Sequence, residues 1–293
     1  MKINLAIIGA GRIGHVHAEA INKNINANLI YVYDTNNSEA NKFASKFNCK
    51  IADINSIKND KNIDAVVICS PTNTHIDLIT NFSRAKKAIF CEKPIDLNIK
   101  KVRRCLTIIE KNNINFMIGF NRRFDPHFLT LKKSIEEGKI GDIEILILTS
   151  RDPGLPPVQY LENSGGLFKD MTIHDFDMAA FLLGELPTEI YSTASVLVDQ
   201  KLKNINDYDT ASLILNTKSG KQIIINNSRR ASYGYDQRIE VHGSKGMISA
   251  ENQRPASIEI ATSKGFTKPP LHHFFMTRYI QAVSYTHLRA HET

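Results

Sequence analysis

Apolar residues in the first 120 positions occur in short uninterrupted runs, and amphipathic stretches separate these runs. The runs predict buried strands at residues 3–8, 29–33, 65–69, 88–91 and 115–118. The amphipathic stretches predict helices at about residues 13–23, 38–47 and 75–84. Short buried strands that alternate with helices indicate βαβ units, so we expect an α/β domain with a doubly wound parallel sheet of the Rossmann type.

The pattern changes after Gly119, where longer strands follow one another directly. Helices are expected at residues 128–137 and 166–183, and strands at residues 143–150, 188–197, 210–216, 221–228, 237–242, 247–250 and 257–262. Gly220 and Gly246 stand where hairpin turns belong. We therefore expect a second, α+β domain with a large, mostly antiparallel open sheet and helices on one face. The predicted domains are residues 1–120 and 121–282.

Residues 283–293 interrupt the amphipathic helix that is expected to begin at Leu271. Codons for the segment VSYTHLRAHET can spell a transposon-type sequencing adapter read through as coding sequence. We interpret residues 283–293 as an adapter-derived artefact that truncates the second domain, with a genuine helix end as the alternative. His287 and His291 lie four residues apart but are accordingly not interpreted as metal ligands, and no metal site is expected elsewhere.

Composition narrows the class of protein. The chain has 293 residues, of which 42% are hydrophobic and 23% charged, as in ordinary globular proteins. No window approaches the roughly 20 apolar residues that span a bilayer. The four cysteines form no CxxC pair and are expected to be reduced thiols of a cytoplasmic protein. The net charge of +7 is spread along the chain, and its densest basic group, residues 100–104, fits the solvated face of a helix. Neither a nucleic acid nor a membrane is expected as a partner, and an enzyme is the favoured class.

Three glycines directly after the first strand suggest a dinucleotide site. Gly9 would permit a tight turn, Gly11 a close approach of the backbone to a pyrophosphate, and Gly14 close packing of helix and strand. The start of the helix would offer free N–H groups to the phosphates. Asp34 ends the next strand 20 residues after Gly14, with no Arg or Lys before Lys42, which favours NAD over NADP. The alternative is an ordinary βα turn with a capping Asp.

Candidate chemistry lies in two other segments. Lys93 follows the predicted strand 88–91, at the sheet edge where ligands bind in open parallel sheets. Asp170 and His174 are four residues apart, which places them on one face of the predicted helix 166–183. Taken alone, the lysine would be interpreted as a surface charge, and an Asp–His pair at this spacing is more often a surface pair than a catalytic one.

Six motifs that occur in order carry a family resemblance: GAGRIGHVHA, SPTNTH, EKP, GFNRRFD, SRDP and GGLFKDMTIHDFDMA. Together they resemble the glucose–fructose oxidoreductase, inositol dehydrogenase and rhizopine catabolism (Gfo/Idh/MocA) family of NAD(P)-dependent sugar oxidoreductases over residues 1–282. The inositol dehydrogenases are the most similar group within it. The resemblance implies an NAD-binding first domain, a second domain that binds substrate and forms oligomers, and a homotetramer built through the open sheet.

The resemblance also assigns roles to residues. It implies catalytic roles for Lys93, Asp170 and His174, with His174 as the general base, and a cis peptide bond before Pro94. The cofactor-binding residues that it implies are Gly9, Gly11, Arg12, Ile13, Gly14, Asp34, Ser70, Pro71, Thr72, Asn73, His75, Glu92, Lys93, Asn121 and Arg122. The substrate-binding residues that it implies are Lys93, Arg151, Asp152, Asp170, His174, Tyr233 and Tyr235. Asn121 departs from the pattern, since inositol dehydrogenases often have Met there.

These residue types suit the oxidation of a secondary alcohol. A histidine with an ordinary pKa of about 6.5 can take the hydroxyl proton, and a lysine cation stabilises the developing alkoxide. The expected activity is NAD-dependent oxidation of a cyclic polyol, myo-inositol in the first place, to its 2-keto form. The alternatives are another inositol isomer or a pyranose sugar as substrate, or a non-catalytic NAD-binding regulator. A regulator would be expected to lose the lysine or the histidine, and both are present.

Overall fold

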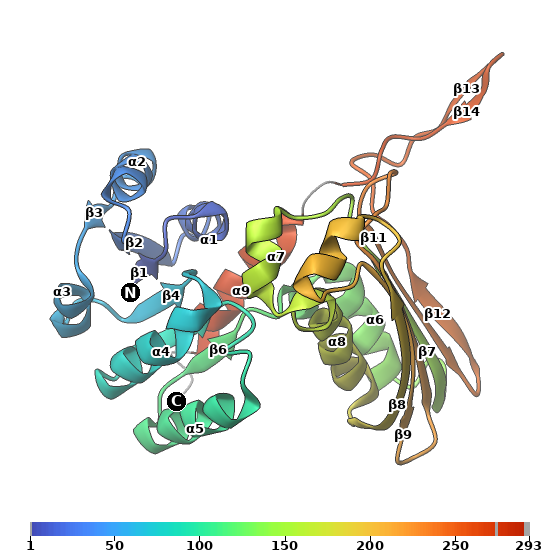
Figure 1. The fold of residues 1–293 in the computed structure, drawn as a ribbon, viewed down its shortest axis with the longest axis horizontal. Coiled ribbons are helices and arrows are strands. Elements are labelled where there is room, and N and C mark those ends of the chain that lie inside the picture. Colours follow the sequence, from blue (N-terminus) through green and yellow to red (C-terminus); the bar gives the residue numbers. More distant parts are fainter. Residues whose placement is uncertain (1, 273–274, 290–293) are drawn as a thin grey trace. The chain divides into compact units, whose positions relative to one another are not determined.

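The computed structural model describes residues 2–272 and 275–289, and it divides into two compact units (Figure 1). The first unit comprises Met1–Phe124 together with Met276–Thr293, and the second comprises Asp125–Phe275. In the described part of the chain no helix is long and apolar enough to cross a membrane.

The first unit is built on a six-stranded parallel sheet. Its strands lie in the order β3-β2-β1-β4-β5-β6, which is the order of dinucleotide-binding domains. They are β1 (Ile3–Ile8), β2 (Ala27–Tyr33), β3 (Lys50–Ile51), β4 (Ala65–Ile68), β5 (Ala88–Cys91) and β6 (Phe116–Ile118). The central strands are mostly apolar, as is typical where helices cover both faces, and residues such as Ile7, Val66 and Ile89 are fully buried. The predicted Rossmann-type sheet is confirmed.

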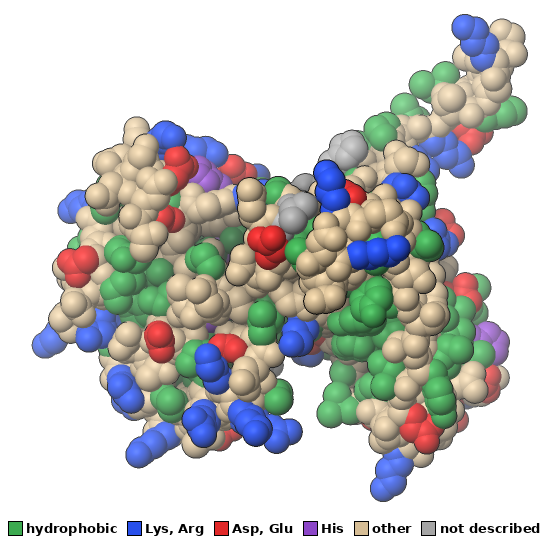
Figure 2. Space-filling model, in the orientation of Figure 1, with side chains coloured by type: hydrophobic (Ala, Val, Ile, Leu, Met, Phe, Trp, Pro, Cys, Tyr) green, Lys and Arg blue, Asp and Glu red, His purple; other side chains and the backbone are tan. Residues whose placement is uncertain are grey.

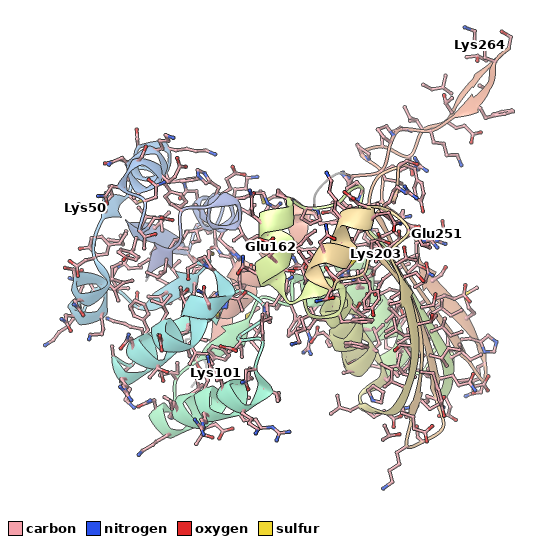
Figure 3. All side chains as sticks on the ribbon, in the orientation of Figure 1. Lys50, Lys101, Glu162, Lys203, Glu251 and Lys264 are labelled. Carbon is pink, nitrogen blue, oxygen red and sulfur yellow. The ribbon has the colours of Figure 1, made fainter. Side chains whose placement is uncertain are left out.

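Helices connect these strands, and side-chain caps fix where most of them begin. They are α1 (Arg12–Asn22), α2 (Asn37–Phe47), α3 (Ile54–Asn59), α4 (His75–Arg84) and α5 (Ile99–Asn112). Asn36, Asp53 and Asn98 each accept hydrogen bonds from N–H groups in the first turn of the helix that follows. The basic residues of α5 lie on its exposed side as expected, and Figure 3 shows Lys101 there.

The C-terminal helix α9 (Met276–Arg289) belongs to the first unit, whereas the sequence analysis placed residues up to 282 in the second domain. It contacts α1 and the short 3₁₀ helix Asn121–Phe124. The buried ring of Tyr279 explains this placement, because it packs on His17 of α1 and its hydroxyl bonds to Asn121. Residues 290–293 lie outside the described part, and the adapter interpretation of the tail remains a prediction.

The second unit contains a six-stranded mixed sheet in the order β12-β11-β7-β10-β9-β8. Its strands are β7 (Ile143–Arg151), β8 (Pro187–Ser195), β9 (Thr210–Thr217), β10 (Gln222–Ser228), β11 (Asp236–Gly243) and β12 (Gly246–Ala250). Only β7 and β10 pair in parallel; the other neighbours are antiparallel, which confirms the predicted mostly antiparallel sheet. A separate hairpin, β13 (Ile260–Thr262) and β14 (Gly265–Thr267), extends away from this sheet and carries Lys264 at its tip (Figures 1 and 3).

Helices cover one face of this sheet. Phe128 of α6 (Pro126–Glu136) and Met178 of α8 (Ile173–Leu183) share a core with Leu146 and Ile223 of the sheet. The opposite face carries Tyr191, Ile214 and Ile224, which are partly exposed. Hydrophobic side chains gather on the surface of this unit around β8 and β9 (Figure 2). The unit also contains α7 (Val158–Ser164) and a 3₁₀ helix, Gln200–Ile205.

The helix predicted at residues 166–183 differs in its first turns. Phe168–Thr172 form a π-helical segment, and α8 follows directly. Residues 166 and 167 are helical and precede this segment; the main-chain N–H of Leu167 is bonded to the Asp207 carboxylate, and Gly166 has a φ of 78°. Short π segments are frequent at functional sites, and this one carries Asp170.

Candidate functional site

The glycine loop has the geometry of a phosphate cradle. Gly9 has a φ of 107°, and a Cβ there would lie 2.8 Å from the main chain of Cys69 and Ser70. A Cβ on Gly14 would lie 2.1 Å from the main-chain oxygen of Gly9. At Gly11, by contrast, no described atom lies within 4 Å of a built Cβ, and no described side chain caps the start of α1. The first N–H groups of α1, at Arg12 and Ile13, can therefore meet a phosphate, and the loop fits the pyrophosphate of NAD.

Asp34 lies where β2 ends and ties the glycine loop in place. Its Oδ2 accepts from the main-chain N–H of Ala10 at 2.7 Å, and its Oδ1 accepts from that of Asn36 at 2.8 Å. A carboxylate has about four acceptor positions, so capacity remains for the hydroxyls of a ribose. The first basic residue after it, Lys42, pairs with Glu39 at 2.7 Å. A 2′-phosphate would thus meet a carboxylate and an already paired lysine, which fits NAD better than NADP.

Lys93 lies at the carboxyl edge of the parallel sheet, directly after β5. The Lys93–Pro94 peptide bond is cis, as the resemblance implied. Ser70 and Thr74 follow β4 at the same edge and bond to each other at 2.6 Å, and a 3₁₀ helix, Thr72–Thr74, carries Thr72 and Asn73 after Pro71. Loops that follow adjacent parallel strands meet at one edge, so the structure brings these candidates together within the first unit.

Cys69 directly follows β4, and Cys91 is the last residue of β5. Both are buried, and burial raises the pKa of each thiol well above its usual value. All four cysteines are free, as the sequence predicted for reduced thiols. Thiols with raised pKa values are poor nucleophiles, so we assign them to packing.

Two of the residues that the resemblance gave to the cofactor direct their polar groups into the unit. The Glu92 carboxylate lies 2.6 Å from Nε2 of His17, a residue that the sequence analysis did not select. Both ring nitrogens of His75 face main-chain oxygens at 2.8 Å, those of Pro94 and Ser70. His75 is 1% exposed, so it supports this edge from beneath.

Asn121 is also tied to the interior. Its amide donates to the hydroxyl of Tyr279 at 2.6 Å, and burial raises the pKa of that tyrosine well above its usual value. The neighbouring Arg122 is buried as well. Neither contact could be read from the sequence, because Tyr279 lies 158 positions further along the chain.

In the second unit, Asp170 is held by two residues that the sequence analysis missed. Its Oδ1 accepts from the hydroxyl of Tyr160 at 2.7 Å, and its Oδ2 accepts from Nη1 of Arg229 at 3.2 Å. Arg229 is fully buried, and its Nε and Nη2 have no hydrogen-bond partner among the described atoms. The alternation of β10 held the missing signal: Ile223 and Ile225 face the helices, so Arg229 falls on the same side as Asp170.

A buried polar network fixes the helix that carries His174. Asp175 accepts from Ser150 of β7 at 2.5 Å and from Asn227 of β10 at 2.8 Å. Thr172 donates to the Oδ1 of Asn227 at 2.6 Å. All four side chains are buried and mutually bonded, so the turn between Asp170 and His174 has a fixed position on the sheet.

The structure separates Arg151 from Asp170 and His174. Its guanidinium bonds to Asn226 at 2.8 Å and to the hydroxyl of Tyr233 at 3.1 Å, and it pairs with buried Asp236 at 3.3 Å. Strand alternation places Arg151, Asn226 and Asp236 on the open face of the sheet, opposite α8. Burial would raise the pKa of Asp236, but hydrogen bonds from Arg238, Tyr233 and Asn252 hold it below its usual value. The predicted substrate residues Arg151 and Tyr233 thus form a cluster of their own.

The remaining two candidates lie close to the same ends of the strands. The main-chain N–H of Asp152 donates to the oxygen of Ser228 at 2.9 Å, which continues the pairing of β7 with β10. The ring of Tyr235 packs on Phe275 with centroids 5.5 Å apart.

Comparison with known proteins shows that both parts of the chain match domains of one protein family. Residues 3–120 match the oxidoreductase family with an NAD-binding Rossmann fold (GFO/IDH/MocA), and residues 128–249 match the C-terminal domain of that family. The chain belongs to the GFO/IDH/MocA family. The family resemblance drawn from the motifs is confirmed, and the chain is an NAD-dependent oxidoreductase.

Individual relatives in this family agree in sequence and fold. An inositol 2-dehydrogenase of Rhizobium meliloti (strain 1021) is 57% identical over 282 residues, which are 96% of this chain and 86% of the relative. A myo-inositol dehydrogenase structure from Corynebacterium glutamicum ATCC 13032 has a TM-score of 0.94 at 38% identity, covering 99% of this chain and 89% of that one. A scyllo-inositol dehydrogenase of Lactobacillus casei, solved with NAD(H) and scyllo-inositol, has a TM-score of 0.90 at 27% identity, covering 99% and 90%.

Proposed function

We propose that this chain oxidises a secondary hydroxyl of myo-inositol to the 2-keto form, with NAD as the hydride acceptor. The observation that carries the proposal is that all three reactive residue types are present, on segments that buried hydrogen bonds fix. Lys93 lies at the edge beside the glycine loop, and Asp170 and His174 lie on a helix fixed by buried hydrogen bonds. The 57% identity to an inositol 2-dehydrogenase supports an inositol as the substrate, and the similarity to the myo-inositol dehydrogenase of Corynebacterium glutamicum supports the myo isomer.

The proposal gives each residue one task. His174 removes the proton of the reacting hydroxyl, since an imidazole can act as a base near neutral pH. The Lys93 ammonium stabilises the negative charge that develops on the same oxygen. Asp170, fixed by Arg229 and Tyr160, orients the imidazole or a neighbouring hydroxyl and favours the imidazolium as it forms. Acceptance of the hydride from the carbinol carbon is the chemistry that NAD supplies when bound.

A neutral polyol is recognised by hydrogen bonds rather than by a counter-charge. Asp152 and Tyr235 remain candidates for such bonds, in addition to Asp170 and His174. Arg151 and Tyr233 are weaker candidates, because their polar groups are already bonded around Asp236 on the other face of the sheet.

Turnover over a panel of polyols tests the proposal. NADH formation is measured with myo-inositol, scyllo-inositol, other inositol isomers and pyranoses, and Lys93→Ala serves as the inactive control. Turnover with myo-inositol that the control lacks is the expected result. Turnover only with another polyol would change the substrate and keep the reaction, and tight NAD binding without any turnover would favour a non-catalytic regulator.

We also propose that the chain forms a homotetramer in the cytoplasm, with copies of itself covering the open sheet face. The apolar residues Tyr191, Ile214 and Ile224 on that face are partly exposed, and an exposed apolar patch is typical of an oligomer interface. The four free cysteines, three of them buried, suit a reducing compartment. Light scattering on the purified protein measures the oligomeric state, and Ile214→Glu is expected to shift it to smaller species; a monomeric unsubstituted chain would contradict the proposal.

A further inference from the structure

The segment Glu92–Lys93–Pro94 is fastened on both sides of the lysine by buried histidines. On one side, Nε2 of His17 lies 2.6 Å from Oε1 of Glu92. On the other side, Nδ1 of His75 lies 2.8 Å from the main-chain oxygen of Pro94. The two histidines come from different helices, α1 and α4, so the lysine is flanked by two independent attachments.

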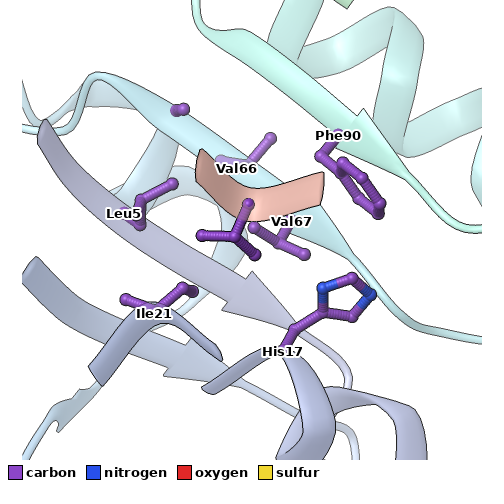
Figure 4. A pocket seen from close by; sticks show the side chains of 8 residues that line it. Leu5, His17, Ile21, Val66, Val67 and Phe90 are labelled. Carbon is purple, nitrogen blue, oxygen red and sulfur yellow. The ribbon is translucent and has the colours of Figure 1, made fainter. Parts of the chain in front are cut away.

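His17 is held firmly enough to serve as an anchor. It is fully buried, and Figure 4 shows its ring beside Phe90, above the strands of the sheet. Its ring packs edge-on against Phe90 at 4.8 Å and Tyr279 at 5.3 Å, measured between centroids. Its Nδ1 has no hydrogen-bond partner in the described part of the chain, so the bond to Glu92 is the polar contact that fixes this ring.

The Glu92 carboxylate fills a space that only glycine leaves open. A Cβ on Gly119 would lie 2.9 Å from Oε2 of Glu92. The main-chain N–H of Glu92 is bonded to Ile68 of β4 at 3.0 Å. Both the backbone and the side chain of the residue before Lys93 are therefore fixed.

His75 connects Pro94 to the neighbouring loop. Its Nε2 lies 2.8 Å from the main-chain oxygen of Ser70, the residue that follows β4 and Cys69. Each of these carbonyl oxygens can accept a hydrogen from the ring nitrogen that faces it. Through this ring, the position of Pro94 is tied to the loop beside the glycine cradle.

We infer that His17 and His75 are positioning residues for Lys93, acting through Glu92 and Pro94 rather than on substrate or cofactor. This inference rests on the proposed function, in which Lys93 stabilises the alkoxide. A misplacement of about 1 Å at a reacting group can cost roughly 100-fold in rate. Loss of either attachment should therefore lower kcat strongly while NAD, bound mainly by the glycine loop, stays bound.

The test separates kcat from cofactor affinity in His17→Phe and His75→Phe, which keep a ring and remove its hydrogen-bonding nitrogens. We expect kcat to fall about 10- to 100-fold, with the Kd for NADH changed less than about threefold. His17→Gln, which can still donate to Glu92, should recover part of the lost kcat. His15→Phe is the matched control, since His15 is on the same helix but packs on Phe43 and Phe47, and it should keep the original kcat.

Hydrogen exchange of the peptide covering residues 88–98 gives a readout that does not need turnover. Faster exchange is expected in both phenylalanine variants and not in His15→Phe. Unchanged kcat in folded variants, or a Kd for NADH that weakens as much as kcat falls, would overturn the inference. If the unsubstituted protein oxidises no polyol, the proposed function fails, and the exchange rates alone decide whether the histidines hold this segment.

Discussion

Lys93 in the first unit and Asp170 in the second both depend on buried partners, but the partners are of different kinds. The segment around Lys93 is held by two imidazole rings on helices, one bonded to a side chain and one to the main chain. Asp170 is held by a fully buried guanidinium that follows a strand. An imidazole can exist as a neutral ring, whereas a guanidinium always carries its charge. Loss of Arg229 should therefore mainly lower the free energy of unfolding, whereas loss of His17 or His75 should mainly lower kcat.

The sharpest way to break this comparison is to remove the reactive groups themselves. Lys93→Ala and His174→Ala should each lower kcat about 1000-fold, because one removes the charge that stabilises the alkoxide and the other removes the base. Steady-state NADH formation with myo-inositol measures both. Lys101→Ala and His15→Ala are the matched controls in the first unit and should stay within about twofold of the unsubstituted chain. A Lys93→Ala or His174→Ala variant that keeps more than about a tenth of kcat would remove that residue from the mechanism.

Loss of the buried guanidinium is expected to have the next largest effect. Arg229→Met should lower the free energy of unfolding of the second unit by about 3 kcal/mol, because it leaves the Asp170 carboxylate without its counter-charge. Arg230→Met is the matched control, since Arg230 is the next residue and is exposed. Denaturant unfolding of both variants measures the difference. Equal midpoints for the two would show that the Arg229–Asp170 pair does not support the fold.

The adjacent residues Arg229 and Arg230 show what the sequence alone cannot predict. Their residue type and neighbours are alike, and only the register of β10 on β9 and β7 decides that Arg229 faces the helices. In the first unit the strand–turn–helix order predicted the glycine loop, Asp34 and the lysine edge, because these follow from local pattern. The bonds from His17 to Glu92 and from Tyr279 to Asn121 join residues 75 and 158 positions apart, and no local pattern encodes such contacts.

The second unit shows the same limit in its secondary structure. The long amphipathic stretch predicted a single regular helix, but a π segment, Phe168–Thr172, follows the contact between Leu167 and Asp207 and interrupts it. Strand alternation, in contrast, could be read from the sequence, and it also determines on which face of the sheet Arg151 lies. Its odd-numbered position in β7 places it on the open face, away from Ser150 and Asp175. Motif order therefore selected the candidate reactive residues, whereas their supporting residues could be found only in the packed structure.

A smaller effect is expected at the cofactor end of the first unit. Asp34→Asn removes the negative charge that would repel a 2′-phosphate and keeps one acceptor oxygen for the glycine loop. We expect the ratio of kcat/KM for NAD to that for NADP to fall roughly tenfold, with the KM for myo-inositol unchanged. Kinetics with both cofactors measure this ratio, and Asp77→Asn, an exposed acid on α4, is the control. A changed polyol KM with an unchanged cofactor ratio would contradict the assignment of Asp34 to the cofactor.

The smallest expected effect is on the stability of the fold at acidic pH. It compares a buried carboxylate in the second unit with surface carboxylates in the first. Asp209 in the second unit is fully buried; burial would raise its pKa, but hydrogen bonds from the main-chain N–H groups of Leu197, Val198 and Asp199 hold the pKa below its usual value. A carboxyl whose pKa is lower in the folded state stabilises the fold fully above its unfolded pKa, near 3.9, and this stabilisation is lost as the pH falls through the folded value. The pKa values of Asp53 and Asp60 in the first unit are also lowered, but both residues lie at the surface, where water screens the effect.

Acid titration followed by hydrogen exchange should therefore show the second unit opening at the higher pH. Asp209→Asn should be less stable than the unsubstituted chain at neutral pH and should show a flatter acid dependence. An unchanged slope in that variant would assign the acid sensitivity to other carboxylates.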